Sequence, residues 1–175
     1  MIIAIRTTDT AGASPDHPVE LGTADSAAWL KQELKRRFPA TKFGVRGDRG
    51  TAAGWYTVSW TDGPTAFAVA MITSEVVGTS FDAQTDSTTY YVTRAQWCPK
   101  RGQWVRPRVR SIDTRRALSD GFRDRVAQAI SARYGTPVPP RDQWHRAQVC
   151  NGSWSEYWTW SAVVYRAAED RSILA

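Results

Sequence analysis

The stretch WYTVSWTDGP, residues 55–64, decides the expected fold, because a β-rich strand runs directly into a turn. Residues 42–46 (KFGVR) also have strand composition, and a Gly-containing stretch, residues 47–54, separates the two segments. The pair therefore predicts a hairpin with a long tip. Alternate side chains of a strand share a face, and three of them are expected to point into the core: Tyr56, Val58 and Trp60.

The turn after this strand predicts a helix. Asp62 can accept hydrogen bonds from the exposed backbone amides at the start of the helix, and Pro64 fits its first turn. Gly78 should end it. The face expected toward the core consists of Phe67, Ala70, Met71, Ser74 and Val77.

Two further helices have clear start and stop signals. The first should be capped by Thr23 or Asp25 and stopped by Pro39, and its apolar residues are Ala27, Leu30, Leu34 and Phe38. The other should begin after Ser119 and end at Gly135. Its apolar residues recur every fourth position: Phe122, Val126, Ile130 and Tyr134.

Residues 88–97 and 104–112 predict a second hairpin around the turn at 98–102. Pro107 cannot donate to a β-ladder, so the returning strand should be an edge strand or a bulged one. Residues 154–166 have the composition of a last strand. The expected fold is therefore a single α+β domain, with an antiparallel sheet of five to six strands and about three helices mainly on one face. We expect a strand-like start and exposed connection at 1–23, the domain at 24–166 and a tail at 167–175.

The positive charge is unevenly distributed. Residues 91–175 hold 15 basic and 7 acidic side chains, whereas residues 1–90 hold 8 and 10. Between Tyr90 and Arg116, eight Lys or Arg residues and four aromatic residues accompany a single acid, Asp113. A cluster of this kind indicates an anionic partner.

The predicted returning strand would place three guanidinium groups, those of Arg106, Arg108 and Arg110, on one face at intervals of about 6 to 7 Å. This spacing suits an extended phosphate backbone, and nearby tryptophans offer rings for stacked bases. The expected partner is nucleic acid or a host nucleic-acid-associated protein. The candidate binding residues are Arg94, Trp97, Lys100, Arg101, Trp104, Arg106, Arg108, Arg110, Arg115 and Arg116. Alternatively, the charges protect an exposed sheet edge from pairing, and the tryptophans belong to the core.

Other candidate sites are weaker. Three carboxylates, those of Asp62, Asp82 and Asp86, have the oxygen chemistry for a divalent cation, but turn and cap roles explain them equally well. His145 and Cys150 lie five residues apart with no third orienting group, which sets no catalytic geometry. We therefore expect no metal, no cofactor and no enzymatic activity. In a regular strand one face would carry Trp154, Trp158 and Trp160, either as core or as a protein-binding surface.

Two cysteines are too few for a disulfide framework, so reduced thiols are expected. The apolar start, residues 1–6, is too short for a signal peptide, and no segment is long enough to span a bilayer. These features predict a cytoplasmic protein with no membrane contact.

The segment Leu34–Asp86 resembles a large polyvalent protein-associated domain, a family that recurs in proteins of phages, plasmids and integrated elements. The motif residues that carry the resemblance are Trp60, Thr61, Asp62, Gly63, Pro64, Phe81, Asp82, Thr85 and Asp86. Similarity continues through the run at 115–119 and the helix ending near Gly135, for a coverage of about residues 28–166. The resemblance implies a mobile-element context and a role in host conflict, without a reaction.

The expected function is a non-enzymatic accessory protein of a phage or mobile element that binds nucleic acid or a host nucleic-acid complex through the Arg-rich hairpin, with anti-defence as a hypothesis within it. The alternative is a protein-interaction module that blocks or recruits a host protein through a Trp-rich face.

Overall fold

A computed structural model describes residues 14–82, 84–90, 92–149 and 158–169. The strands within these ranges are β1 (Val19–Glu20), β2 (Gly44–Gly47), β3 (Trp55–Thr61), β4 (Thr79–Asp82), β5 (Ser87–Tyr90), β6 (Gln96–Cys98), β7 (Gln103–Arg106) and β8 (Ser111–Ala117). The helices are α1 (Thr23–Arg37), α2 (Ala66–Ser74), α3 (Asp120–Tyr134) and α4 (Trp160–Glu169), with short 3-10 turns at Gly50–Ala52 and Arg141–Gln143. The α+β class is thus confirmed.

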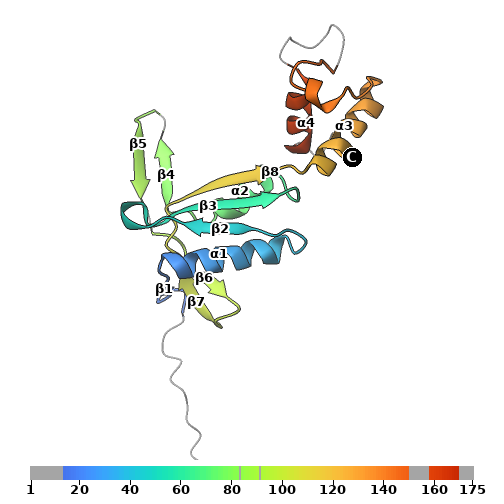
Figure 1. The fold of residues 1–175 in the computed structure, drawn as a ribbon. Helices are drawn as coiled ribbons and strands as arrows, with labels where there is room; N and C mark the ends of the chain where they lie inside the picture. Colours follow the sequence, from blue (N-terminus) through green and yellow to red (C-terminus); the bar gives the residue numbers. More distant parts are fainter. Residues whose placement is uncertain (1–13, 83, 91, 150–157, 170–175) are drawn as a thin grey trace, which may run out of the picture.

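The central sheet has the strand order β2-β3-β8 (Figure 1). β2 and β3 form the predicted antiparallel hairpin, in which Val45 pairs with Val58. β8 pairs with the other edge of β3 in parallel, from Trp55 opposite Ser111 to Thr61 opposite Ala117. The expectation of one antiparallel sheet is therefore wrong: this sheet is mixed, and the strands of the described residues are divided among three small sheets.

The second predicted hairpin forms only around its turn. β6 and β7 pair antiparallel over three positions, and β1 adds to β7 in parallel. β7 is thus a central strand rather than an edge strand, and it ends at Arg106 because Pro107 cannot continue the ladder. Residues 88–90 belong instead to the β4-β5 hairpin, and residues 111 and 112 begin β8.

The main core lies between the central sheet and two helices. Tyr56, Val58 and Trp60 are buried, as predicted from strand alternation. They form one apolar cluster with three residues of α1, namely Trp29, Leu30 and Leu34, and with Val69 of α2. The two helices therefore cover the same face of the sheet, and no helix of the described residues lies on its other face (Figure 1).

Helix α1 begins earlier than its periodicity predicted. Thr23 is already its first residue, Gly22 occupies the cap position, and no side chain caps it. The predicted caps, Thr23 and Asp25, are therefore wrong. The buried stripe and the end of the helix before Pro39 agree with the prediction.

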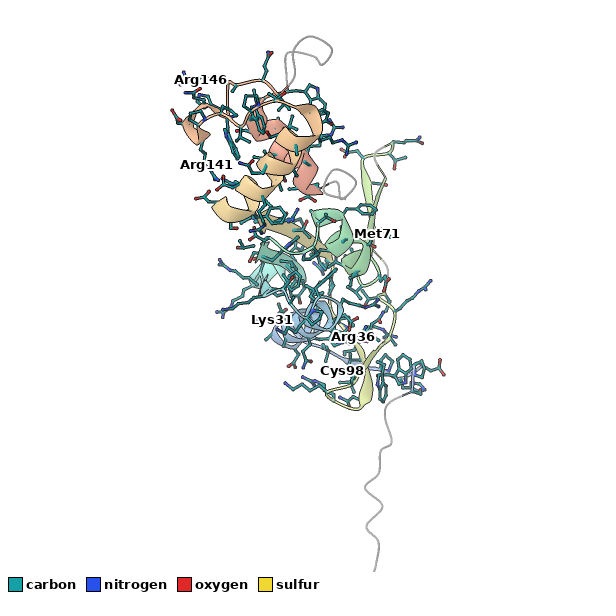
Figure 2. All side chains as sticks on the ribbon, turned by 90° about the vertical axis from the view of Figure 1, so that its right-hand side faces the viewer. Lys31, Arg36, Met71, Cys98, Arg141 and Arg146 are labelled. Carbon is teal, nitrogen blue, oxygen red and sulfur yellow. The ribbon has the colours of Figure 1, made fainter. Side chains whose placement is uncertain are left out.

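Helix α2 turns the opposite face to the core from the one predicted. Phe67 and Met71 are 72% and 55% exposed, whereas Val69 and Thr73 are buried. Met71 is labelled on α2 in Figure 2. Nearly every residue of this helix is apolar, so periodicity could not select its inner face. Its cap is Thr65, whose hydroxyl accepts from the Ala68 amide, and not Asp62. The helix ends at Ser74, before Gly78.

The C-terminal helices form a second apolar cluster. Helix α3 is confirmed, with Ser119 accepting from the Phe122 amide and Gly135 ending it in a left-handed conformation. Val126 and Ile130 pack against α4 residues such as Trp160 and Val164. The predicted strand at 154–166 is wrong over its described part, because α4 begins at Trp160 and continues into the expected tail as far as Glu169.

We expect Val69→Ala to lower the free energy of unfolding by about 1.5 to 3 kcal/mol, because two buried methyl groups are lost and a cavity remains. The matched change Phe67→Ala removes a larger but exposed side chain from the same helix and should cost less than about 0.5 kcal/mol. Urea unfolding of both variants measures the difference. Equal losses would contradict the observed orientation of α2.

Candidate functional site

The β6–β7 hairpin places two tryptophans opposite each other. Trp97 pairs with Trp104 in the ladder, and their rings meet edge to face with centroids 5.8 Å apart. Trp97 is 49% exposed, whereas Cys98 and Val105 are buried on the other side. The hairpin therefore presents one aromatic side to solvent and keeps its other side in the core.

Two predicted cations, Lys100 and Arg101, lie in the turn of this hairpin, and Arg94 lies two residues before β6. Arg94 and Lys100 are exposed. Arg101 is also exposed and donates to Asp25 of α1 at 2.8 Å. Exposed ion pairs of this kind contribute at most about 1 kcal/mol, so a phosphate can replace the carboxylate with little loss.

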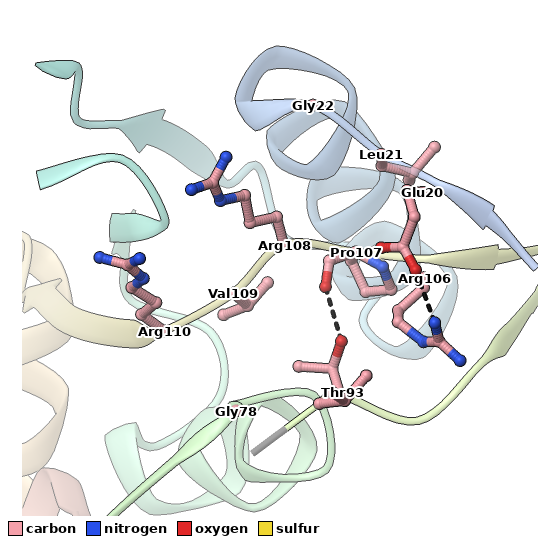
Figure 3. A pocket seen from close by; sticks show the side chains of 11 residues that line it. Glu20, Leu21, Gly22, Gly78, Thr93, Arg106, Pro107, Arg108, Val109 and Arg110 are labelled. Carbon is pink, nitrogen blue, oxygen red and sulfur yellow. Dashed lines mark hydrogen bonds and ion pairs between the residues drawn. The ribbon is translucent and has the colours of Figure 1, made fainter. Parts of the chain in front are cut away.

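The arginine ladder does not form as a regular strand. Only Arg106 lies in β7, and it donates to Glu20 at 2.5 Å. Arg108 and Arg110 follow in an irregular segment and extend to the same side, whereas Arg106 turns toward Glu20 (Figure 3). Buried Pro107 and Val109 alternate with these arginines and line a pocket of about 590 Å³ with Gly78 and Thr93.

The backbone of Arg108 is held firmly although its side chain is exposed. Its amide donates to the Ser26 hydroxyl at 2.9 Å, and its carbonyl accepts from the Tyr56 hydroxyl at 3.0 Å. Burial raises the pKa of Tyr56 above its ordinary value, so this phenol stays protonated as the donor. The exposed guanidinium of Arg108 is thus carried on a fixed backbone.

Arg115 and Arg116 serve different purposes. Arg115 is 71% exposed on β8 and donates to Asp113 at 2.8 Å. The side chain of Arg116 is only 3% exposed, and its guanidinium also stacks over the Phe122 ring. The structure therefore corrects the prediction for Arg116, which is not available to an external ligand.

Arg116 is the centre of a polar network between the two apolar clusters. Its guanidinium donates to the carbonyls of Asp62, Gly63 and Ala168 and to a carboxylate oxygen of Glu169. The other oxygen of Glu169 accepts from the Ala66 amide at the start of α2, at 2.8 Å. Sequence inspection did not identify Glu169, since no local pattern marks a carboxylate at the end of α4 as a partner of Arg116.

Asp62 connects the same turn to α3. Its carboxylate accepts from the amide and hydroxyl of Ser119 at 2.7 and 2.6 Å. Partial burial raises the pKa of Asp62, but these hydrogen bonds, with the charges of Arg125 and Arg116, outweigh burial and hold that pKa below its ordinary value. The predicted cap of α2 is instead a tether for the helix that follows β8.

The turn itself requires its small residues. Asp62 and Gly63 both have positive φ, at 57° and 59°. A Cβ atom on Gly63 would lie 2.6 Å from the hydroxyl of buried Thr41, so glycine is needed for space as well as for conformation. Trp60 closes the turn by donating from its indole to the Pro64 carbonyl at 2.9 Å.

The other residues of the family motif lie in the β4–β5 hairpin, away from the Asp62 turn. Phe81 and Asp82 belong to β4, and Thr85 and Asp86 to the β4–β5 turn, where the Thr85 and Ser87 hydroxyls are 2.8 Å apart. This turn lies away from the end of β3 that precedes Asp62 (Figure 1). Within the described residues, no group of three metal-ligating side chains is found.

Those of the remaining candidates that the structure describes do not form a common site. Trp160 is buried beside Trp144 in the second cluster, and Trp158 is half-buried beneath Arg166. Trp154 and Cys150 lie outside the described residues, and His145 is exposed. The expected tryptophan face is therefore core at Trp160.

Comparison with known proteins identifies the class of protein and then its family. The class is that of the large polyvalent protein-associated domains, which the sequence motif around the Trp60–Pro64 turn had indicated. Residues 21–119 match the model of large polyvalent protein associated domain 29, and because this is more than half of the chain, the protein belongs to that family. Family membership associates it with phages and mobile elements.

No curated protein and no solved structure matches the chain. The family match ends at Ser119, where α3 is capped, and is shorter than the expected range of 28–166. Among the residues described here, no helix has the length and apolar character needed to cross a membrane.

We expect Arg116→Met to lower the free energy of unfolding by about 3 kcal/mol, because it leaves Glu169 and three carbonyls without their donor. The adjacent change Arg115→Met removes an exposed charge and should cost less than about 1 kcal/mol. Urea unfolding of both variants is the measurement. Similar losses would show that the Arg116 network does not hold the clusters together.

The lowered pKa of Asp62 predicts a dependence of stability on pH. A carboxyl group whose pKa is lowered by folding stabilises fully above its unfolded pKa of about 3.9, and this contribution disappears as the pH falls through the folded pKa. Wild-type protein should therefore be more stable than Asp62→Asn at pH 7, and the difference should shrink below about pH 4. A difference that stays constant between pH 7 and pH 3 in urea unfolding would contradict this role.

Proposed function

We propose that this phage- or mobile-element-associated protein is a non-enzymatic accessory protein that binds nucleic acid in the cytoplasm through the β6–β7 hairpin and Arg108. The observation that carries the proposal is the half-exposed Trp97, packed edge-on against Trp104 in a hairpin whose turn carries the exposed Lys100. A fixed aromatic ring and cations on one hairpin suit a strand that stacks a base on the ring and brings neighbouring phosphates to the cations.

The cations of this surface differ from those expected at first. Arg116 is excluded by its burial, and Arg106 is held by Glu20. Arg94, Lys100 and Arg108 are exposed, and Arg101 can exchange Asp25 for a phosphate. Because the backbone of Arg108 is anchored by Ser26 and Tyr56, little ordering of the main chain would be needed on binding.

A second candidate function is binding of a host protein. It is favoured by the exposure of Phe67 and Met71, which stand four residues apart on one side of α2, rather than by the tryptophans. An anti-defence role is a hypothesis within either function, because the family belongs to the setting of phages and mobile elements.

Replacing Lys100, Arg101 and Arg108 together with alanine should weaken binding of a labelled oligonucleotide and reduce the slope of log K against log salt by about 2, since each lost phosphate contact contributes about 0.7 to 0.9. Fluorescence anisotropy over a range of salt concentrations measures both quantities. Trp97→Ala should weaken binding without changing the salt slope.

The matched control replaces three exposed arginines of the C-terminal region: Arg123, Arg133 and Arg146. It removes the same charge and should leave the affinity within about twofold. Equal losses in the two triple variants would contradict the hairpin location. Absence of binding by wild-type protein at low salt would favour the second candidate function.

A further inference from the structure

The face of the central sheet that carries no helix is accessible to solvent along its whole length. Strand alternation and the pairing register place small side chains in its middle, and these are Gly44 of β2, Thr57, Ser59 and Thr61 of β3, and Ala117 of β8. Of these residues only Thr57 is half-buried, and the others are exposed. The face is therefore a flat floor of hydroxyl and small groups.

Cations stand on both sides of this floor. Arg46 lies opposite Thr57 on β2, and Arg115 lies opposite Ser59 on β8, both exposed. At one end, Lys31 of α1 and Lys42 join Arg115 around an open groove of about 920 Å³. Lys31 lies on α1 (Figure 2). Within the described residues, neither lysine takes part in an ion pair.

Three acidic groups near the floor already have partners. Asp113 lies opposite Thr57 and accepts from Arg115, and Asp62 at the edge of the groove accepts from Ser119. Glu169 is bound to Arg116 behind the groove. Among the described residues, the cations without an ion pair on this face are Lys31, Lys42 and Arg46, and they outnumber Asp48, which follows β2 beside Trp55. Arg115 can exchange Asp113 for a phosphate, because exposed ion pairs are weak. The net charge that faces an incoming ligand is therefore positive, and the complementary ligand is anionic.

The far end of the same face carries an aromatic ring. Trp55 opens β3, is 53% exposed and shares the parity of Thr57 and Ser59. From Trp55 to Thr61 the strand spans about 20 Å, which is about three nucleotides of an extended strand. Lys42 and Arg46 are about 13 Å apart along their side of the floor, about two internucleotide steps.

We propose that this open face of β2-β3-β8 binds single-stranded nucleic acid, with phosphates along Lys42, Arg46 and Arg115 and a base stacked on Trp55. A flat sheet face with a ring at one end requires unstacked bases, which single strands offer and duplexes do not. The small side chains of the floor allow a nucleic-acid strand to approach the sheet closely. Space is already limited at Gly44, where a Cβ atom would lie 2.7 Å from the Ser59 hydroxyl. This inference rests on the proposed function in assuming a nucleic-acid ligand, but it names a different surface and the form of the strand.

The test compares labelled dT12 and a duplex of the same length by fluorescence anisotropy. The triple variant Lys42→Ala, Arg46→Ala, Trp55→Ala should bind dT12 at least tenfold more weakly, with a smaller effect on any duplex binding. Ser59→Glu, which puts a carboxylate in the middle of the floor, should have an effect of similar size. Gln128→Glu adds the same charge at an exposed position of α3 and should change the affinity less than twofold.

Photocrosslinking with iodouracil-containing dT12, followed by mass spectrometry, locates the base contact. Attachment at Trp55 supports the inference, and attachment at Trp97 alone overturns it.

If the hairpin variants weaken dT12 binding and the sheet-face variants leave it within twofold, the inference fails while the proposed function stands. If only the sheet-face variants weaken it, the hairpin location fails and the inference stands, and absence of binding by wild-type protein overturns both. Circular dichroism and urea unfolding confirm that these exposed changes leave the fold intact.

Discussion

The buried guanidinium of Arg116 is the interaction on which the arrangement of the two apolar clusters depends. A charge removed from water is tolerated only when its hydrogen-bond donors and its charge are matched, and Arg116 meets three carbonyls and the Glu169 carboxylate. Glu169 in turn accepts from the Ala66 amide, where the dipole of α2 favours an anion. Through Asp62 and Ser119 the same turn also holds the start of α3. The Asp62–Gly63 turn and the end of α4, each more than fifty positions from Arg116 in the sequence, thus meet at one side chain.

Strand β8 gives two neighbouring arginines, Arg115 and Arg116, different roles. Side chains alternate along β8, so Arg116 points to the buried side of the sheet and Arg115 to the open side. Once Arg116 is committed to the clusters, Arg115 is fixed beside Ser59 in the parallel register with β3. The positive rim of the open face is therefore a geometric consequence of the buried network. A one-residue shift of β8 would exchange the two roles and leave a charge unpaired in the core.

The parts of the fold that could be predicted are those specified by local signals. Alternation in residues 55–60 identified the buried face of β3, and Ser119 and Gly135 marked both ends of α3. The parallel pairing of β8 with β3 could not be predicted, because it joins residues more than fifty positions apart and no local pattern encodes it. Helix α2 is apolar on all sides, and α4 was misassigned because its aromatic and β-branched residues hid a helical spacing of Trp160, Val163, Val164, Ala167 and Ala168. For the candidate site, composition identified the basic region but not which arginines are buried, since burial depends on those distant pairings.

The two surfaces with aromatic rings and cations differ in how well they are organised before a ligand arrives. The β6–β7 hairpin pairs over only three positions, whereas β3 is flanked by a strand on each side and packed on α1 and α2 from behind. The chain that leaves the hairpin is also fixed to the sheet, because the Gly54 carbonyl accepts from the amides of Arg110 and Ser111 beside Trp55. A rigid floor loses little conformational entropy on binding. The sheet face should therefore retain much of its contact energy as affinity, which is the physical reason to locate the single strand there.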